Sequence, residues 1–141
     1  MRFTDLVIRA LPGNEWEIMD DFYADLRPEI SQFRGIVWIP KGFTTDLASI
    51  PHPIRGLLDI DSEVSAVIHD YGIKRKHLRV IHTLKEIHDG QIELTPQHHY
   101  NPEAVSRRQI DAIFRKTLRA SGVSRWRCWV LWSGVRIGAL F

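Results

Sequence analysis

The stretch LVIRALPGNEWEIMDDFYADL, residues 6–26, decides the fold class because apolar and polar residues alternate along most of it. Apolar residues occupy most even positions on both sides of the segment Pro12-Gly13-Asn14. A period of two is typical of strands with one buried face, and proline, glycine and asparagine in succession favour a tight turn. The stretch therefore predicts an antiparallel hairpin, with one strand over 3–11 and the other over 16–26.

Outward from this hairpin, the chain first continues as sheet and then changes to helical periodicity after residue 60. In chain order, the further predicted elements are a strand over 34–40, a helix from 61 or 62 to about 76, a hairpin over 79–94 that turns at 88–91, a helix from 101–103 to 121–122, and a helix from about Ser124. This order predicts an α+β fold, in which an N-terminal antiparallel sheet is followed by two to three packed helices. We expect one domain over 1–141, β-rich over 1–40 and mainly helical over 61–141, with the hairpin near 79–94 as an insert.

Length, charge and cysteine content exclude several classes of protein. The 141 residues suit a single core, and the net charge of +2 is too small to indicate a nucleic-acid binder. The single cysteine, Cys128, excludes an intramolecular disulfide framework. The first ten residues lack the apolar middle region of a signal peptide. We therefore expect a protein of the cytoplasm or of a virus particle that binds no nucleic acid.

The helical segment VSAVIHDYGI, residues 64–73, carries the strongest candidate for chemistry. At 100° per residue its apolar residues form one stripe, and His69 points away from that stripe beside small and apolar neighbours. His69 should therefore be buried against a second element. An imidazole accepts protons near neutral pH or binds metal, and the adjacent Asp70 is able to ligate or orient. The alternative is a core histidine that is hydrogen-bonded to a carbonyl.

A second buried carboxylate is expected at Asp111, on the edge of the apolar stripe of the helix SRRQIDAIFRKTL. A desolvated carboxylate needs a partner, which is either Arg107 or Arg115 on the same helix, or His69 across a helix–helix contact. Asp46, in the segment GFTTDLASIP that links sheet and helices, is a further polar residue among apolar neighbours.

These observations predict one polar site with divided roles. His69 and Asp111 would be catalytic, with Asp111 orienting the imidazole, and Asp46 and Asp70 would hold a divalent metal ion, the candidate cofactor. We expect the polar groups of Asp46, His69 and Asp111 to converge, with a carboxylate oxygen about 3 Å from the ring of His69.

The C-terminal segment SRWRCWVLWSGVRIGALF holds three of the five tryptophans. Its arginines argue against a membrane span. Three roles stay open for it: a core helix, an interfacial membrane helix, or a docking surface for another subunit. The stripe of Arg125, Trp129, Trp132 and Arg136 is the predicted contact surface, and Trp126 and Val130 are predicted to face the core because their stripe carries no arginine.

Together these motifs resemble a family of phage and prophage proteins, domain of unknown function 1353. The resemblance rests on GFTTDLASIP, on His69-Asp70-Tyr71, on the helical pattern Arg-x-x-Ile-Asp-x-x-Phe at 107–114, and on the Trp-rich tail that follows Ser-Arg-Trp-Arg. It covers the chain from Ile36 almost to Phe141. The residues that fall on the family's motif positions are Asp46, Ser49, Pro51, His69, Asp70, Tyr71 and Asp111. The chain departs from the pattern at His52, at Ile110 and in a longer insert over roughly 78–100.

The resemblance implies a phage context and transfers no activity, so two functions are open. The first is a phage-encoded protein with a hydrolase-like His/Asp site, acting by metal-assisted hydrolysis on a component of the cell envelope. The second is a non-catalytic virion component, a tail or baseplate protein, in which the same residues form a buried structural network. Its expected partners are other phage structural proteins that bind the C-terminal helix, and its expected location is the host cytoplasm or the virion.

Overall fold

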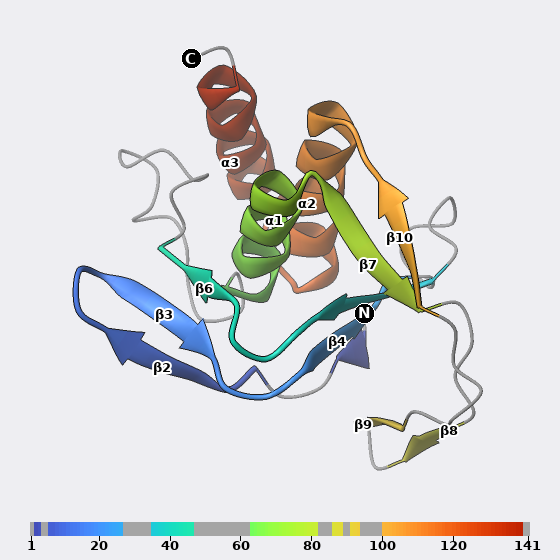
Figure 1. Cartoon of the computed structure of the whole chain (residues 1–141). Helices are drawn as coiled ribbons and strands as arrows, with labels where there is room; N and C mark the ends of the chain where they lie inside the picture. Colours follow the sequence, from blue (N-terminus) through green and yellow to red (C-terminus); the bar gives the residue numbers. More distant parts are fainter. Residues whose placement is uncertain are drawn as a thin grey trace.

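The described residues of the chain fold into two antiparallel sheets, a small hairpin and three helices, which confirms the predicted α+β class (Figure 1). This computed structural model describes residues 2–3, 6–26, 35–46, 63–81, 86–88, 91–93 and 100–139. The strands are β1 (Arg2–Phe3), β2 (Ile8–Leu11), β3 (Glu15–Ile18), β4 (Phe22–Asp25), β5 (Ile36–Ile39), β6 (Thr44–Thr45), β7 (His77–Ile81), β8 (Glu86–His88), β9 (Gln91–Glu93) and β10 (Tyr100–Ala104). The helices are α1 (Glu63–Arg75), α2 (Arg107–Ala120) and α3 (Arg125–Gly138).

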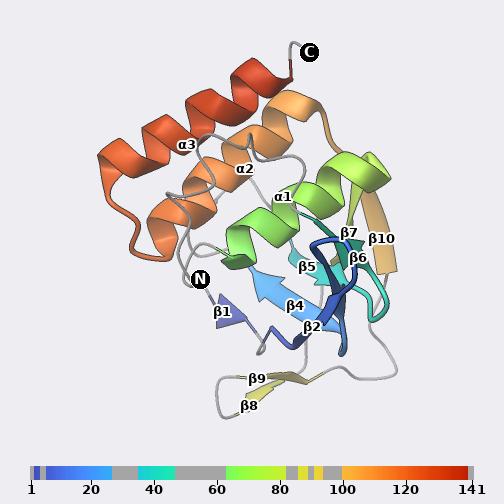
Figure 2. The ribbon, with the colours of Figure 1, turned by 90° about the vertical axis from the view of Figure 1, so that its left-hand side faces the viewer.

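The larger sheet has five strands in the order β1-β4-β5-β7-β10, and α1 packs against it. Figure 2 shows the helices stacked on one side of this sheet, with α1 next to the strands, α2 on α1, and α3 farthest out. The main core lies between sheet and α1, where residues such as Phe22, Ile39 and Tyr71 are almost completely buried. A second core lies between the helices, where Ala66 of α1 meets apolar side chains of α2 and α3. As a result, the middle of α1 is buried on all sides.

The predicted N-terminal hairpin is present, but both of its strands are shorter than predicted. The first strand, expected over 3–11, is β2 alone, because Phe3 belongs to β1 of the larger sheet. β2 and β3 pair antiparallel, Ile8 opposite Ile18, and the turn uses positive φ values at Gly13 and Asn14. The single strand expected over 16–26 is wrong, because the chain changes sheets at residues 19–21. β3 pairs with β6 in the smaller sheet, whereas β4 pairs with β5 in the larger one. The Asp21 carboxylate marks this change of sheet, since it accepts a hydrogen bond from the backbone of Lys41 at 2.8 Å.

The start of the second helix was also predicted too early. Residues 101–103 are part of β10, which pairs with β7 at the edge of the sheet, where a proline is tolerated. The helix α2 begins after Ser106, whose hydroxyl accepts from the backbone N–H of Gln109 while the Gln109 side chain accepts from the Ser106 backbone. This capping box satisfies donors that the first turn leaves unpaired, and it outweighs the cap-and-proline signal at residues 101–102.

The other predicted helix boundaries agree closely with the structure. α2 ends at Ser121, followed by Gly122 with a φ of 92°, and α3 begins after Ser124. The hairpin predicted over 79–94 begins too early, because residues 79–81 belong to β7 of the larger sheet. Among the described residues, its strands are β8 and β9, which pair from Glu86 opposite Glu93 to His88 opposite Gln91. Within the described ranges, no helix combines the length and the apolar character needed to cross a membrane.

Candidate functional site: a buried charge network between three helices

Two neighbouring polar residues of α1, His69 and Asp70, are buried and face different elements. Each is only 1% exposed, which is unusual for ionisable side chains without partners. Successive residues of a helix point about 100° apart, so His69 meets α2 while Asp70 meets β6. The two residues therefore belong to two separate polar clusters.

The first cluster joins His69 to Asp111 of α2, with His69 Nε2 lying 2.6 Å from Asp111 Oδ1. Both side chains are completely buried. The ring of His69 also packs against Phe114, with the ring centroids 4.9 Å apart. The predicted contact between these two residues, distant in sequence, is therefore present.

Two arginines complete this cluster by binding the same carboxylate. Arg107 Nε donates to Asp111 Oδ1 at 3.0 Å, and Arg136 of α3 donates to Asp111 Oδ2 at 2.9 Å. A second nitrogen of Arg107 donates to the backbone carbonyl of Val135 on α3 at 3.1 Å. One carboxylate thus connects all three helices. We call His69, Arg107, Asp111 and Arg136 the three-helix network.

The surroundings of Asp111 keep its carboxyl group ionised. Burial by itself would raise the pKa of this carboxyl, but the hydrogen bonds from His69 and Arg136 and the positive charge of Arg107 outweigh burial and lower its pKa below the usual value. Because an ionised carboxylate only accepts hydrogen bonds, His69 Nε2 must carry the proton that it shares with Asp111. This fixes the tautomer and the orientation of the imidazole.

The lowered pKa predicts a specific pH dependence of stability. An aspartate whose pKa is lower in the folded than in the unfolded state stabilises the fold above its unfolded pKa of about 3.9, and that stabilisation is lost as the pH falls through the folded-state pKa. We expect the difference in free energy of unfolding between the wild-type protein and Asp111→Asn to shrink progressively below about pH 4. Urea unfolding at a series of pH values measures this difference. A difference that stays constant through this range would contradict the assignment of Asp111 as an ionised centre.

The second cluster surrounds Asp70 at the contact between α1 and β6. The hydroxyl of Thr45 donates to Asp70 Oδ2 at 2.5 Å, and Lys74 Nζ lies 3.1 Å from the same oxygen. Lys74 Nζ also lies 3.8 Å from Asp46 Oδ1, and its ammonium group is 5.8 Å from the centre of the Phe43 ring. Lys74 therefore links Asp46 to Asp70, and its positive charge stands between the two carboxylates that were predicted to hold a metal ion.

The structure thus divides the predicted site into two clusters. It brings His69 and Asp111 together, and it joins Asp46 to Asp70 through Lys74 on another side of α1. Among the described residues, no group of three or more histidine, cysteine, aspartate or glutamate side chains is placed to hold a metal ion. Ser49, Pro51 and His52 lie outside the described residues.

Several members of the two clusters were missed by the sequence analysis. Arg136 was expected on an outward stripe, and instead it turns inward to Asp111. Lys74 could have been found, because it stands four residues after Asp70 on the same helix face. Thr45 carried no comparable signal, since its contact with Asp70 depends on how β6 lies against α1. Arg115 was a candidate partner of Asp111, but its guanidinium lies over two indole rings.

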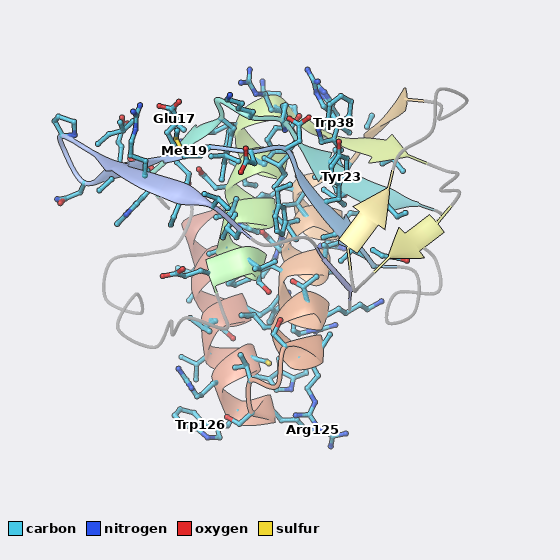
Figure 3. All side chains as sticks on the ribbon, turned by 90° about the horizontal axis from the view of Figure 1, so that it is seen from below. Glu17, Met19, Tyr23, Trp38, Arg125 and Trp126 are labelled. Atoms are coloured by element: carbon cyan, nitrogen blue, oxygen red, sulfur yellow. The ribbon has the colours of Figure 1, made fainter. Side chains whose placement is uncertain are left out.

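The orientation of α3 also differs from the prediction. Cys128, Leu131 and Val135 face the core at helical spacing, whereas Trp126 is 63% exposed and Val130 is exposed as well. The expectation that Trp126 and Val130 point inward is therefore wrong. The prediction assumed that the stripe of α3 without arginine faces the core. In the structure, α2 instead packs against the face of α3 that carries Cys128, Leu131 and Val135. Figure 3 shows Trp126 and Arg125 at the beginning of α3, projecting away from the body of the molecule.

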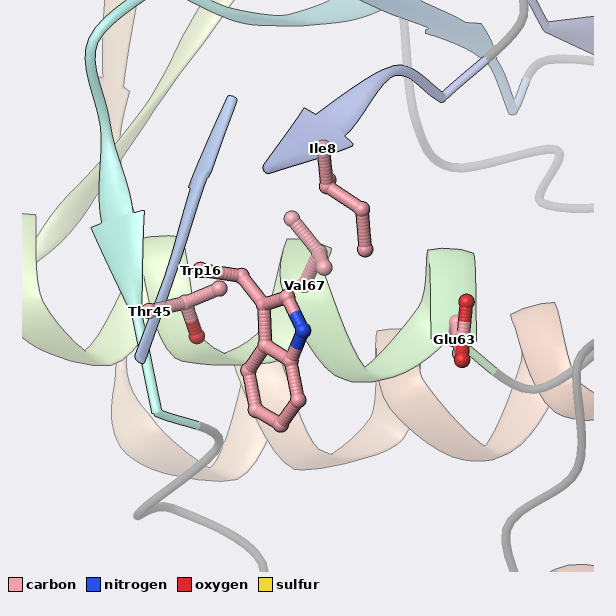
Figure 4. A pocket seen from close by; sticks show the side chains of 5 residues that line it. All are labelled: Ile8, Trp16, Thr45, Glu63 and Val67. Carbon is pink, nitrogen blue, oxygen red and sulfur yellow. The ribbon is translucent and has the colours of Figure 1, made fainter. Parts of the chain in front are cut away.

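An apolar cavity of about 50 Å³ lies between the N-terminal hairpin, β6 and α1 (Figure 4). Its lining residues are Ile8, Trp16, Thr45, Glu63 and Val67. Glu63, Val67 and Asp70 lie on one face of α1, and His69 points to another. This cavity is therefore separate from the pair of His69 and Asp111.

Comparison with known proteins places the chain in a family. The model of the family described as "Protein of unknown function (DUF1353)" matches residues 16–135, which is most of the chain and includes the cluster around Asp70 and all of the three-helix network except Arg136. No match was found among curated proteins or among solved structures. The match begins at Trp16, so it includes most of β3 and all of β4, as well as the motifs on which the resemblance rests up to residue 135. The chain therefore belongs to the DUF1353 family.

Proposed function

We propose that the protein is a non-catalytic assembly component, in which the three-helix network holds a rigid helical layer together and α3 presents a binding face to a partner. A phage particle is the setting that the family resemblance suggests. The observation that carries the proposal is the complete burial of the His69 and Asp111 side chains. A general base must reach the proton that it removes from a substrate. Complete burial of His69 therefore favours assembly over hydrolysis.

The contacts of the network support a structural role. Asp111 receives hydrogen bonds from His69, Arg107 and Arg136, which come from α1, α2 and α3 respectively. A buried ion pair in which every partner is satisfied specifies how its elements dock, and removal of one partner is costly. The two arginines donate to the same carboxylate as His69, so Asp111 is shared among three donors.

The outer face of α3 supports a binding role. Four of the five large apolar side chains that are exposed among the described residues lie on this helix: Trp126, Trp129, Val130 and Ile137. Scattered single apolar residues are normal on a surface, but a group of them on one helix is typical of an interface. The inner face of α3 is also apolar, so apolar residues lie on two opposite faces of this helix. Such a pattern is typical of a helix that is buried on both faces, which here would require a partner on the outer face.

Two substitutions of His69 test the proposal. His69→Ala is expected to lower the free energy of unfolding by about 1–3 kcal/mol, because the buried carboxylate loses a donor. His69→Gln keeps an N–H donor of similar reach and has no basic ring nitrogen, so it should recover part of that loss. Thermal melts measure both effects, and hydrolysis of dye-labelled peptidoglycan and of phospholipid vesicles is measured in parallel. Hydrolysis by the wild-type protein that His69→Gln abolishes would overturn the proposal.

A hydrolase is the second candidate, and one specific observation favours it. The imidazole of His69 is held at 2.6 Å by a carboxylate whose pKa is lowered, so the tautomer and orientation of His69 are fixed as in a general-base pair. In this case Nε2 faces Asp111, and Nδ1 would be the nitrogen that accepts a proton. Asp70 and Asp46 would hold a divalent metal ion only after Lys74 had moved away from between them.

A further inference from the structure

We infer that Arg115, Trp129 and Trp132 form a preorganised recognition site for an acidic segment of a partner protein. The inference rests on the proposed function, since it names the chemistry of the partner that α3 would bind. Arg115 comes from α2 and the two tryptophans from α3, so the site exists only when these helices are docked on each other. We call these three residues the Arg–Trp cluster.

The geometry of the Arg–Trp cluster holds its side chains in place. The guanidinium carbon of Arg115 lies 4.8 Å from the centre of the Trp129 ring and 5.2 Å from that of Trp132. The two indole rings are perpendicular, with their centroids 5.2 Å apart. Cation–π and edge-to-face contacts of this kind stabilise one arrangement of side chains before a partner binds. Fewer side-chain conformations are then lost on binding, which favours affinity.

The charge around the cluster selects an acidic ligand. Residues 107–139 include eight arginine or lysine residues and one acidic residue, Asp111, which is completely buried in the three-helix network. Arg107 and Arg136 are bound to Asp111, and the other basic residues of 107–139 give α2 and α3 an excess of positive charge. Within the described ranges, Arg115 makes ring contacts and no ion pair. A guanidinium stacked on an aromatic ring keeps its in-plane N–H donors for a carboxylate.

The same observations disfavour two other occupants. A second copy of this chain would bring two positively charged helix pairs together, and like charges across an interface are costly. An anionic lipid surface would attract the arginines, but an interfacial helix carries its basic and aromatic residues on separate faces, whereas the guanidinium of Arg115 lies directly over the two indole rings. Arginine and tryptophan are also the residues most enriched among the energetically dominant positions of protein–protein interfaces. An acidic protein segment therefore fits the cluster best.

Selection from a library of random displayed peptides tests this inference with the whole protein. We expect the selected peptides to be enriched in aspartate and glutamate next to apolar residues, and their binding to weaken as salt is added. For a selected peptide made by synthesis, Arg115→Gln should raise the dissociation constant by about tenfold or more. The matched control is Lys41→Gln, which removes one exposed positive charge outside α2 and α3 and should leave binding unchanged.

The outcomes separate this inference from the proposed function. Any of three results would overturn the recognition site. The selected peptides would show no acidic enrichment, Arg115→Gln would bind the peptide as tightly as the wild type, or the protein would bind vesicles of phosphatidylcholine with phosphatidylserine in place of peptides. Trp132→Ala removes a second member of the Arg–Trp cluster and should weaken peptide binding as well. A melting curve of Arg115→Gln that matches that of the wild type shows that this variant is folded, so that its weaker binding comes from the loss of the guanidinium. Hydrolysis of an envelope substrate would overturn the non-catalytic role alone, because no residue of the Arg–Trp cluster belongs to the three-helix network.

Discussion

Replacement of Asp111 by alanine is expected to lower the free energy of unfolding by about 3–5 kcal/mol, the largest effect of a single substitution outside the apolar core. The carboxylate is the common acceptor for His69, Arg107 and Arg136, which come from three different helices. Its removal leaves two guanidinium groups close together with no counter-charge and takes a partner from a fully buried imidazole. Such a loss is a large part of the total stability of a domain of this size, which is about 5–15 kcal/mol.

Chemical denaturation monitored by circular dichroism measures this effect. The matched control is Glu17→Ala, which breaks an ion pair with Arg9 of similar length, 2.8 Å, on the surface of the N-terminal hairpin. Because that pair is partly in solvent, its loss should cost no more than about 1 kcal/mol. An Asp111→Ala protein that unfolds like the wild type but has lost a measurable hydrolytic activity would show that the pair of His69 and Asp111 is catalytic rather than structural.

Removal of residues 124–141 is expected to abolish cooperative folding. These residues include α3, whose buried side chains Cys128, Leu131 and Val135 complete the second core with Phe114 and Leu118 of α2. Each fully buried aliphatic side chain contributes about 1.5–3 kcal/mol, and without α3 the apolar face of α2 would be exposed to water. The deletion also removes Arg136 from Asp111 and the Val135 carbonyl from Arg107, so the three-helix network loses its third helix.

Size-exclusion chromatography and a thermal melt of the truncated protein measure this outcome. The control is Trp126→Ala, which removes the most exposed of the large apolar side chains of α3 and should leave the melting temperature nearly unchanged. A truncated protein that stays monomeric and melts cooperatively would show that α3 is an appendage rather than part of the core.

Local sequence signals predicted most elements of the fold, and they failed where tertiary pairing competed with them. The turn at Pro12-Gly13-Asn14 and the helix end at Ser121-Gly122 are encoded by backbone preferences of neighbouring residues, so both were predictable. The run 16–26 and the segment at 101–103 were misassigned. Their residues tolerate the predicted local structure, but pairing with strands distant in sequence determines the observed one.

The candidate site shows the same limit at the level of side chains. Sequence alone indicated that His69 and Asp111 are buried polar residues that need partners, because each stands among apolar neighbours at helical spacing. Sequence could not choose among the alternatives for Asp111, which were Arg107, Arg115 and His69. Packing chose two of them and added Arg136, while Arg115 turned to the tryptophans of α3.

The sequence by itself determined the α+β class, the three helices, the N-terminal hairpin and the need of His69 and Asp111 for buried partners. All of these depend on residue periodicity and on local backbone preferences, which act within a few residues of the chain. Only the tertiary structure decided that Asp70 joins β6 through Thr45, that Arg136 turns inward, and that Trp126 faces outward. Those outcomes depend on which helix face a distant element covers, and that choice balances desolvation and packing across the whole domain rather than within any one segment.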